Sequence, residues 1–170
     1  EEMFLDSLEK PEVLRHFLRY GGRGTILSYP VDIAEYRDLT IDETRELLHR
    51  LVPAEDVAFL RGFENAIEIG DYLFVHAGVN PDLPLDGQST KDLRWIRNPF
   101  LSHQGDFGRC VIHGHTIFDA PDFRGNRIGI DTGAYMSGRL TALGLEGTQR
   151  WLIATEESGG TIIAAQAQAG

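Results

Sequence analysis

Cysteine is almost absent from this chain of 170 residues, in which Cys110 is the only one. One cysteine excludes an internal disulfide framework, and its place in the apolar run Cys110-Val111-Ile112 predicts a small buried core residue. The N-terminal stretch Glu1-Glu2-Met3-Phe4 is acidic and lacks the apolar segment of a signal peptide. We therefore expect a cytoplasmic protein.

Long apolar runs and an excess of positive charge are also missing. No run approaches the ~20 apolar residues that span a bilayer. The 26 acidic residues outnumber the 16 basic ones, which gives a net charge of −10. Such a chain repels nucleic acid and anionic membrane surfaces at long range, so we expect neither as a partner. An anionic small substrate would need local positive charge from a metal ion or an arginine.

Internal repeats and proline-rich linkers are absent, and the sequence therefore predicts one compact domain over residues 1–155. The residues after Glu156 are rich in Gly, Ala and Gln without periodicity, so we expect residues 156–170 to form a disordered tail. Within the domain, the pattern changes near residue 63 from helical periodicity to short, mostly antiparallel strands.

Local signals mark several elements. Apolar residues after Pro11 recur at helical spacing, and Tyr20-Gly21-Gly22 predicts the end of that helix. Thr40 and Glu43 have the spacing of a capping box, and Pro53 opens a third helix. Further on, Gly70-Asp71 predicts a two-residue hairpin turn. The remaining expected elements are the hairpin strands Ala66 to Ile69 and Tyr72 to Val75, a helix from Asp92 to Leu101, and strands from Arg109 to Ile112, Arg127 to Ile130, Leu140 to Leu145 and Trp151 to Ala154.

Three histidines follow apolar runs of strand type. His76 follows Tyr72-Leu73-Phe74-Val75, whereas His113 and His115 follow Val111-Ile112. Imidazole is the most frequent metal-binding side chain, and neighbouring strand ends can bring such ligands together. Because alternate residues of a strand point to opposite faces, we expect only one of His113 and His115 to be a ligand. The other histidines, expected to be solvated surface side chains, are His16, His49 and His103.

Five motifs stand in a fixed order: His76-Ala77-Gly78 with Pro81, Asp92-Leu93-Arg94-Trp95-Ile96-Arg97, His113-Gly114-His115-Thr116, Asp131-Thr132-Gly133-Ala134 and Gly138-Arg139-Leu140-Thr141-Ala142-Leu143. Together they resemble the second half of a bacterial calcineurin-like metallophosphoesterase of the PPP type, the group of serine/threonine protein phosphatases and diadenosine-tetraphosphatase-like enzymes. The resemblance covers about residues 1–155. It implies an α/β fold, the four-layer α-β-β-α sandwich, with the N-terminal half of the fold missing from this chain.

The resemblance also implies a reaction. In that family two divalent metal ions, usually manganese, iron or zinc, bind the phosphate and a bridging water that attacks phosphorus in line. His76 and His115 would be ligands of the second metal. Ile117, two places after His115, favours phosphatases over the nuclease-like members, which usually carry Gly-His-x-His. The implied activity is hydrolysis of phosphate monoesters by metal-activated water, with manganese as the expected metal and protein phosphoserine or phosphothreonine as the expected substrate.

Two alternatives stay open. Within enzymes, the alternative is a symmetrical bis(5'-nucleosyl)-tetraphosphatase acting on a small phosphoester. From another class, the alternative is a non-catalytic module that kept the scaffold and two histidines and binds a partner or a single metal ion.

The chain departs from the family in its first half. The expected Asp-x-His, Gly-Asp-x-x-Asp-Arg-Gly and Gly-Asn-His motifs do not occur, and Glu1 matches the residue that follows the last of them. Two imidazoles without a bridging carboxylate make a poor dinuclear site. We therefore expect this chain alone to be inactive, with weak metal affinity. We also expect it to self-associate through exposed strand faces at Leu73 to Val75 and Val111 to Ile112.

Arg97 is the expected phosphate-binding residue. It closes the helical motif, and a guanidinium can hold two phosphate oxygens at once in a geometry that lysine cannot match. Arg127 and Arg139 are weaker candidates, because an ion pair with an acidic neighbour explains them equally well. Trp95 and Phe100 are expected to anchor the core rather than to stack a base.

Two further segments have simpler expected roles. Asp131-Thr132-Gly133 predicts a strand-end turn whose side chains satisfy turn amides or support the His115 loop. Residues 32–62, rich in Asp, Glu and Arg, predict solvated helix faces with some capacity to cap the substrate side of a site.

Overall fold

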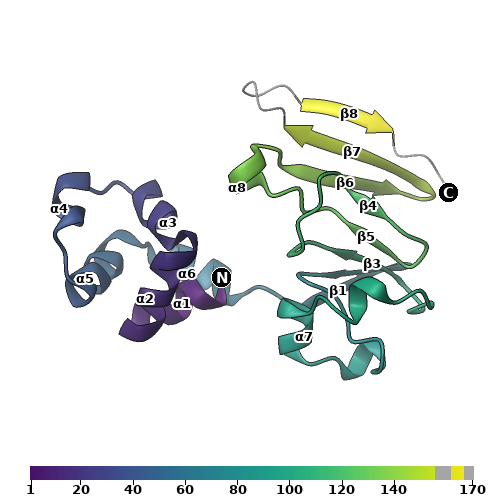
Figure 1. The fold of residues 1–170 in the computed structure, drawn as a ribbon, viewed down its shortest axis with the longest axis horizontal. Helices are drawn as coiled ribbons and strands as arrows, with labels where there is room; N and C mark the ends of the chain where they lie inside the picture. Colours follow the sequence, from purple (N-terminus) through teal and green to yellow (C-terminus); the bar gives the residue numbers. More distant parts are fainter. Residues whose placement is uncertain (156–161, 167–170) are drawn as a thin grey trace. The chain divides into compact units, whose positions relative to one another are not determined.

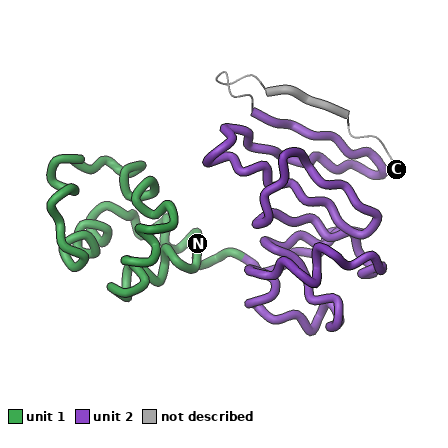
Figure 2. The backbone as a smooth tube through the Cα atoms, viewed as in Figure 1, with its two compact units in different colours: residues 1–63 green, residues 64–170 purple. Residues whose placement is uncertain are grey.

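The computed structural model describes residues 1–155 and 162–166. The chain divides into two compact units, residues 1–63 and residues 64–170, shown in green and purple in Figure 2. The boundary coincides with the change of pattern expected near residue 63. We describe each unit by itself, and the assignment of residues 1–155 to a single domain stays a prediction.

Unit 1 is helical, as its periodicity predicts. The capping box is confirmed, because the Thr40 amide donates to the Glu43 carboxylate at 2.8 Å while the Glu43 amide donates to the Thr40 hydroxyl at 3.3 Å. Gly21, with φ +97°, makes a kink rather than the expected end, and the chain continues helically beyond it. The elements are α1 (Glu2–Glu9), α2 (Pro11–Phe17), η1 (Leu18–Gly22), α3 (Arg23–Ser28), α4 (Ile33–Arg37), α5 (Ile41–Leu51) and α6 (Ala54–Arg61).

Unit 1 has its own apolar core. Helices α1, α2, α3 and α5 each contribute to it, so the core follows from the apolar spacing seen in the sequence. Its fully or nearly buried side chains are Phe4, Leu8, Leu14, Phe17, Ile26, Tyr36, Leu47, Leu48 and Val52.

Unit 2 contains two sheets (Figure 1). The five-stranded sheet has the order β1-β2-β3-β5-β4, and the three-stranded sheet has the order β6-β7-β8. Every strand expected from the sequence is present to within about two residues at its ends. The strands are β1 (Ala66–Ile69), β2 (Tyr72–Val75), β3 (Cys110–His113), β4 (Asp122–Phe123), β5 (Arg127–Gly129), β6 (Thr141–Glu146), β7 (Gln149–Thr155) and β8 (Ile162–Gln166).

Pairing is antiparallel at the edges and parallel in the middle of the five-stranded sheet. The hairpin around Gly70, with φ +59°, joins β1 to β2 as expected. The parallel pairs β2–β3 and β3–β5 depart from the mostly antiparallel expectation. Parallel strands need long connections, and the segment between β2 and β3 contains η2 (Leu85–Gly87), α7 (Thr90–Trp95) and η3 (Phe100–Ser102). The remaining helix of unit 2 is α8 (Ala134–Ser137).

Helix α7 is shorter than the expected Asp92 to Leu101. Ser89 caps its start by accepting the Asp92 amide at 3.0 Å. The helix ends at Trp95 because Ile96 is extended, and Pro99 disfavours a helical conformation at the residue before it. Arg97 therefore lies in the loop after the helix.

The two faces of the five-stranded sheet have different neighbours. Leu73 and Val111 are buried against the α7 segment, where Leu93 and the fully buried Phe100 belong to the same cluster. Ile112, on the other face, is also buried. The expected exposure is thus wrong for Leu73 and Val111, which the α7 and η3 segment covers, and for the buried Ile112, whereas Phe74 and Val75 are half-buried.

The fold is mixed α/β, as expected, and the four-layer sandwich stays a prediction. Cys110 is half-buried rather than a full core residue. Of the expected disordered tail, residues 156–161 and 167–170 lie outside the described residues, and Ile162–Gln166 pairs with β7 as β8. Among the described residues, no helix is long and apolar enough to cross a membrane.

Candidate functional site

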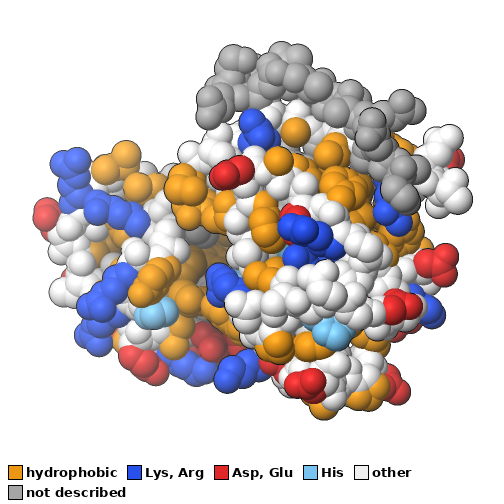
Figure 3. Space-filling view, turned by 45° about the vertical axis from the view of Figure 1, so that its right-hand side comes forward, with side chains coloured by type: hydrophobic (Ala, Val, Ile, Leu, Met, Phe, Trp, Pro, Cys, Tyr) orange, Lys and Arg blue, Asp and Glu red, His pale blue; other side chains and the backbone are white. Residues whose placement is uncertain are grey.

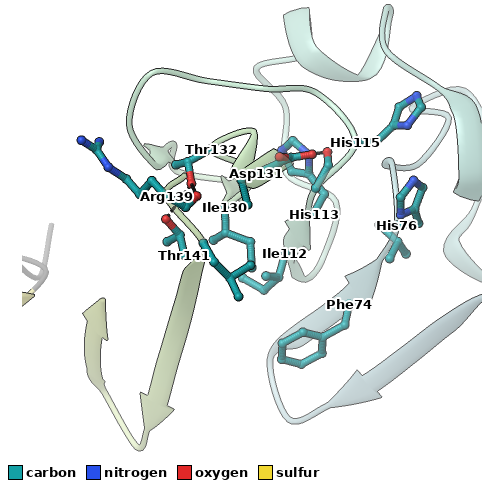
Figure 4. Close-up of a pocket in the computed structure, with 14 residues that line it drawn as sticks. Phe74, His76, Ile112, His113, His115, Ile130, Asp131, Thr132, Arg139 and Thr141 are labelled. Carbon is teal, nitrogen blue, oxygen red and sulfur yellow. Dashed lines mark hydrogen bonds between the residues drawn. The ribbon is translucent and has the colours of Figure 1, made fainter. Parts of the chain in front are cut away.

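A cavity of about 370 Å³ lies at the ends of the central strands of unit 2 (Figure 4). Phe74 and Ile112 form its floor from the five-stranded sheet, and Leu140 and Thr141 line it from the start of β6. Most of the exposed lining surface is apolar, although half of the lining residues have polar side chains. These polar lining residues are His76, His113, His115, Asp131, Thr132, Arg139 and Thr141.

His76 and His115 come together at one edge of the sheet. β2 and β3 are parallel neighbours, with Phe74 opposite Ile112, so their carboxyl ends meet. His76 directly follows β2, and its carbonyl accepts the Gly114 amide at 2.9 Å. The two imidazole ring centroids are 5.1 Å apart. Figure 4 shows the two rings next to each other.

His113 and His115 have different environments because a turn separates them. His113 is the last residue of β3, is 1% exposed, and packs edge-on against Phe100 with ring centroids 4.9 Å apart. His115 has φ +62°, and the Thr116 amide donates to the Gly114 carbonyl at 2.6 Å across the turn. The expected separation of the two side chains is therefore observed, although a left-handed residue beyond the strand produces it rather than strand alternation.

The environment favours neutral forms of both of these histidines. Burial lowers the pKa of His115, and the nearby Arg97 and His76 side chains lower it further, against Asp131 and a hydrogen bond with the Trp95 backbone. Burial lowers the pKa of His113 to about 4. The Nε2 atom of His115 is buried and has no hydrogen-bond partner within the described part of the chain. A neutral imidazole with a free ring nitrogen is the form that binds a metal ion.

Asp131 and Thr132 form the strand-end turn that the sequence predicts. The Asp131 carboxylate accepts the Gly133 amide at 2.9 Å, and the Thr132 hydroxyl bonds to the Arg139 carbonyl at 2.6 Å. Phe118 in the loop after His115 donates its amide to the Asp131 carbonyl at 2.9 Å. The turn thus holds the loop that carries His115.

The three arginine candidates differ in what they already contact. Arg127 is buried, with an ion pair to Asp122 at 2.6 Å and a hydrogen bond to the Leu101 carbonyl at 3.0 Å, so it is a structural residue. Arg139 lines the cavity and donates to the Asp119 carbonyl at 3.2 Å. Arg97 is exposed, and its effect on His115 places its charge near the imidazole pair.

Phe100 and Trp95 differ in burial. Phe100 is fully buried and anchors the core, as expected. Trp95 is 48% exposed, so its expected core role is wrong, and its ring stands edge-on to His115 with centroids 5.7 Å apart. The physical reason is helical geometry, because Trp95 lies two residues, or about 200°, after the buried Leu93 and so on the opposite face of α7.

The remaining histidines are not among the residues that line the cavity. His16 and His49 are exposed, as expected for surface side chains. His103 is half-buried, because its ring packs on Phe107 with centroids 4.9 Å apart. Residues 32–62 belong to unit 1, and their role as a cap stays a prediction.

The donor set suits one divalent ion in part. The two imidazoles, of which His115 has a free Nε2, can each ligate a divalent ion such as manganese, iron or zinc. In residues 1–155, no group of three or more His, Cys, Asp or Glu side chains is arranged to hold a metal. A second ion would therefore need ligands other than those described.

The chain is similar to a known enzyme. No family model matches the chain. The chain is 27% identical over 155 residues to a bis(5'-nucleosyl)-tetraphosphatase PrpE, designated asymmetrical, of Geobacillus thermodenitrificans. The match covers 78% of this chain and 58% of the relative, so the chain spans less than two thirds of the relative's length. This similarity supports the broad resemblance to phosphoester-hydrolysing enzymes of the metallophosphoesterase superfamily.

Proposed function

We propose that the chain is part of a metal-dependent phosphoesterase that hydrolyses a phosphoester or phosphoanhydride with water. The observation that carries the proposal is the meeting of His76 and His115 at the ends of two parallel strands, with ring centroids 5.1 Å apart. The name of the relative supports the same reaction class. A dinucleoside tetraphosphate now ranks ahead of a phosphoprotein as the substrate, since that relative is named for cleaving one.

The chain's own residues would divide the work. His76 and His115 would hold one divalent ion, and Arg97 would bind phosphate oxygens beside it. When bound, the metal centre supplies an activated water and neutralises charge on the phosphate. Asp131 and Thr132 would keep the His115 loop in place. Ligands of a second ion, and a proton donor for the leaving group, would come from residues beyond these 170.

The test uses this chain extended upstream through a Gly-Asn-His motif and supplied with manganese. We expect hydrolysis of diadenosine tetraphosphate, abolished by His115→Ala together with loss of bound metal. His49→Ala, an exposed histidine of unit 1, is the matched control and should keep both activity and metal. Full activity in His115→Ala with folding intact would contradict the assignment.

The products identify the cleavage mode. An asymmetrical enzyme releases a mononucleotide and a nucleoside triphosphate, whereas the symmetrical alternative releases two nucleoside diphosphates. A phosphoserine peptide in the same assay tests the protein phosphatase alternative. A non-catalytic module would bind manganese through His76 and His115 and hydrolyse none of these substrates.

A further inference from the structure

Trp95 does not pack in the core of unit 2, so core packing does not explain a tryptophan at this position. Its neighbours Leu93 and Ile96 are 7% and 9% exposed, whereas the Trp95 side chain is 48% exposed. An exposed indole leaves a large apolar area in water, and the fold gains no core packing from that area. Such a ring next to a candidate active site indicates a contact with a ligand.

The position of the Trp95 indole indicates which kind of ligand it could contact. Trp95 is edge-on to His115, at 5.7 Å between centroids and 86° between planes. An edge contact leaves the flat faces of the indole available for stacking. Arg97 follows two residues later, so one short segment carries both a guanidinium and an aromatic face beside the imidazole pair.

We infer that Trp95 is a specificity-determining residue that stacks the nucleobase of a nucleotide substrate whose phosphate lies at His76 and His115. The inference rests on the proposed function and names its substrate class. Stacking on an aromatic side chain tolerates any base, because every base presents a π face. The substrate class is therefore a nucleoside polyphosphate without strong base preference.

A purely supporting role for Trp95 makes a different prediction. If the indole only held His115 in place, Trp95→Ala would reduce metal binding and the turnover of every phosphoester alike. If the indole stacks a base, the loss is confined to substrates that contain one, and it appears in KM.

The kinetic test compares two substrates in the upstream-extended chain. Trp95→Ala should raise KM for diadenosine tetraphosphate roughly 5- to 100-fold. The same variant should leave metal content and the hydrolysis of phosphoserine within about twofold. Trp95→Phe should recover most of the loss, and Trp151→Phe is the control at the chain's other tryptophan. Equal losses on both substrates, or no change in KM, would overturn the inference.

A binding test separates this inference from the proposed function. In the 170-residue chain, Trp151→Phe leaves Trp95 as the single tryptophan, so its fluorescence reports on this site alone. We expect saturable quenching by AMP and none by ribose 5-phosphate, which lacks the base. Equal responses to both, or no response to AMP, would overturn the stacking role, while failure to hydrolyse any phosphoester with AMP quenching intact would overturn only the proposed reaction.

Discussion

The two histidines around Gly114 show how one residue of separation can assign opposite roles. His113 is enclosed by aromatic rings, and its Nδ1–H donates to the Gly114 carbonyl at 3.1 Å. The Nε2 atoms of both rings are buried without a hydrogen-bond partner among the described residues, but only His115 leaves the strand and meets His76. The first histidine is part of the core, and the second is available for chemistry.

His113 should make the fold sensitive to acid. Its pKa of about 4 in the folded chain lies below the ordinary value of 6.5, so its contribution to stability is complete above about pH 6.5. As the pH falls from there towards 4, the unfolded chain takes up the proton first and up to about 3 kcal/mol is lost. Urea unfolding of the parent chain and His113→Leu at several pH values measures this. An identical acid slope in both chains would remove His113 from the explanation.

Arg97 should act on substrate rather than on metal. We expect Arg97→Ala in the upstream-extended chain to raise KM and lower kcat about tenfold or more, because a bidentate guanidinium strengthens its hold as charge builds on the phosphate oxygens. Arg97→Lys should recover part of the activity. Metal content should not change in either variant. Lys91→Ala, an exposed cation of α7, serves as the control, and kinetics equal to that control would make Arg97 an ordinary surface arginine.

A helix cap and a turn that depend on nearby residues were predicted correctly from the sequence. Strand pairing that depends on residues far apart in the chain was not. The Thr40 capping box and the Gly70 hairpin depend on residues two or three apart, and both are present as predicted. The parallel pairing of β2 with β3 depends on the whole connection between them, which no short pattern encodes. Trp95 is an exception, since its exposure follows from a local relation that the expectation overlooked: it lies two residues after the buried Leu93, on the opposite face of α7.

The site follows the same rule. His76 and His115 could be singled out from strand-end context and family motifs, because both signals are local. Their approach to 5.1 Å depends on the parallel pairing. A left-handed conformation is uncommon for any residue other than glycine, so the sequence did not indicate one at His115. The sequence did not show whether Arg127 binds phosphate or pairs with an acidic neighbour. The structure shows an ion pair with Asp122, which lies on the short strand β4, an element that was not predicted.

The β4–β5 pair contains a buried ion pair that should be sensitive to the loss of one partner. Asp122→Ala would leave the Arg127 guanidinium, 6% exposed, without its carboxylate. We expect a loss of about 3 kcal/mol in the free energy of unfolding, since an unpaired buried charge is costly. The double variant Asp122→Ala with Arg127→Met should recover most of it. Chemical denaturation compares the chains, and a single variant as stable as the parent would show that water reaches the guanidinium.

For the whole molecule, exposed apolar side chains are the feature with the widest effect. Hydrophobic side chains, orange in Figure 3, remain at the surface of the described residues. Around α8, Tyr135, Met136 and Leu140 are 86%, 70% and 63% exposed. Neighbouring exposed apolar groups of this size favour association.

We expect the 170-residue chain to self-associate through this region. Sedimentation velocity at micromolar concentration should show species larger than a monomer, and Tyr135→Ser with Met136→Lys should shift the distribution towards the monomer. Phe59→Ser, at an exposed phenylalanine of unit 1, is the matched control. A monodisperse monomer for the parent chain would show that its surface is closed to association.

At His115, the left-handed backbone lowers the stability of the metal-free chain, while the imidazole would stabilise the metal-bound chain. A non-glycine residue at φ +62° lowers the free energy of unfolding by roughly 1–2 kcal/mol. Glycine at this position would recover about 1 kcal/mol, because its greater conformational freedom in the unfolded chain offsets the rest. Thermal melts without metal should therefore rank His115→Gly above the parent, and saturating manganese should reverse the order, because only the parent gains from binding. Selection for thermal stability alone would therefore favour replacement of His115. Selection for metal binding would favour its retention.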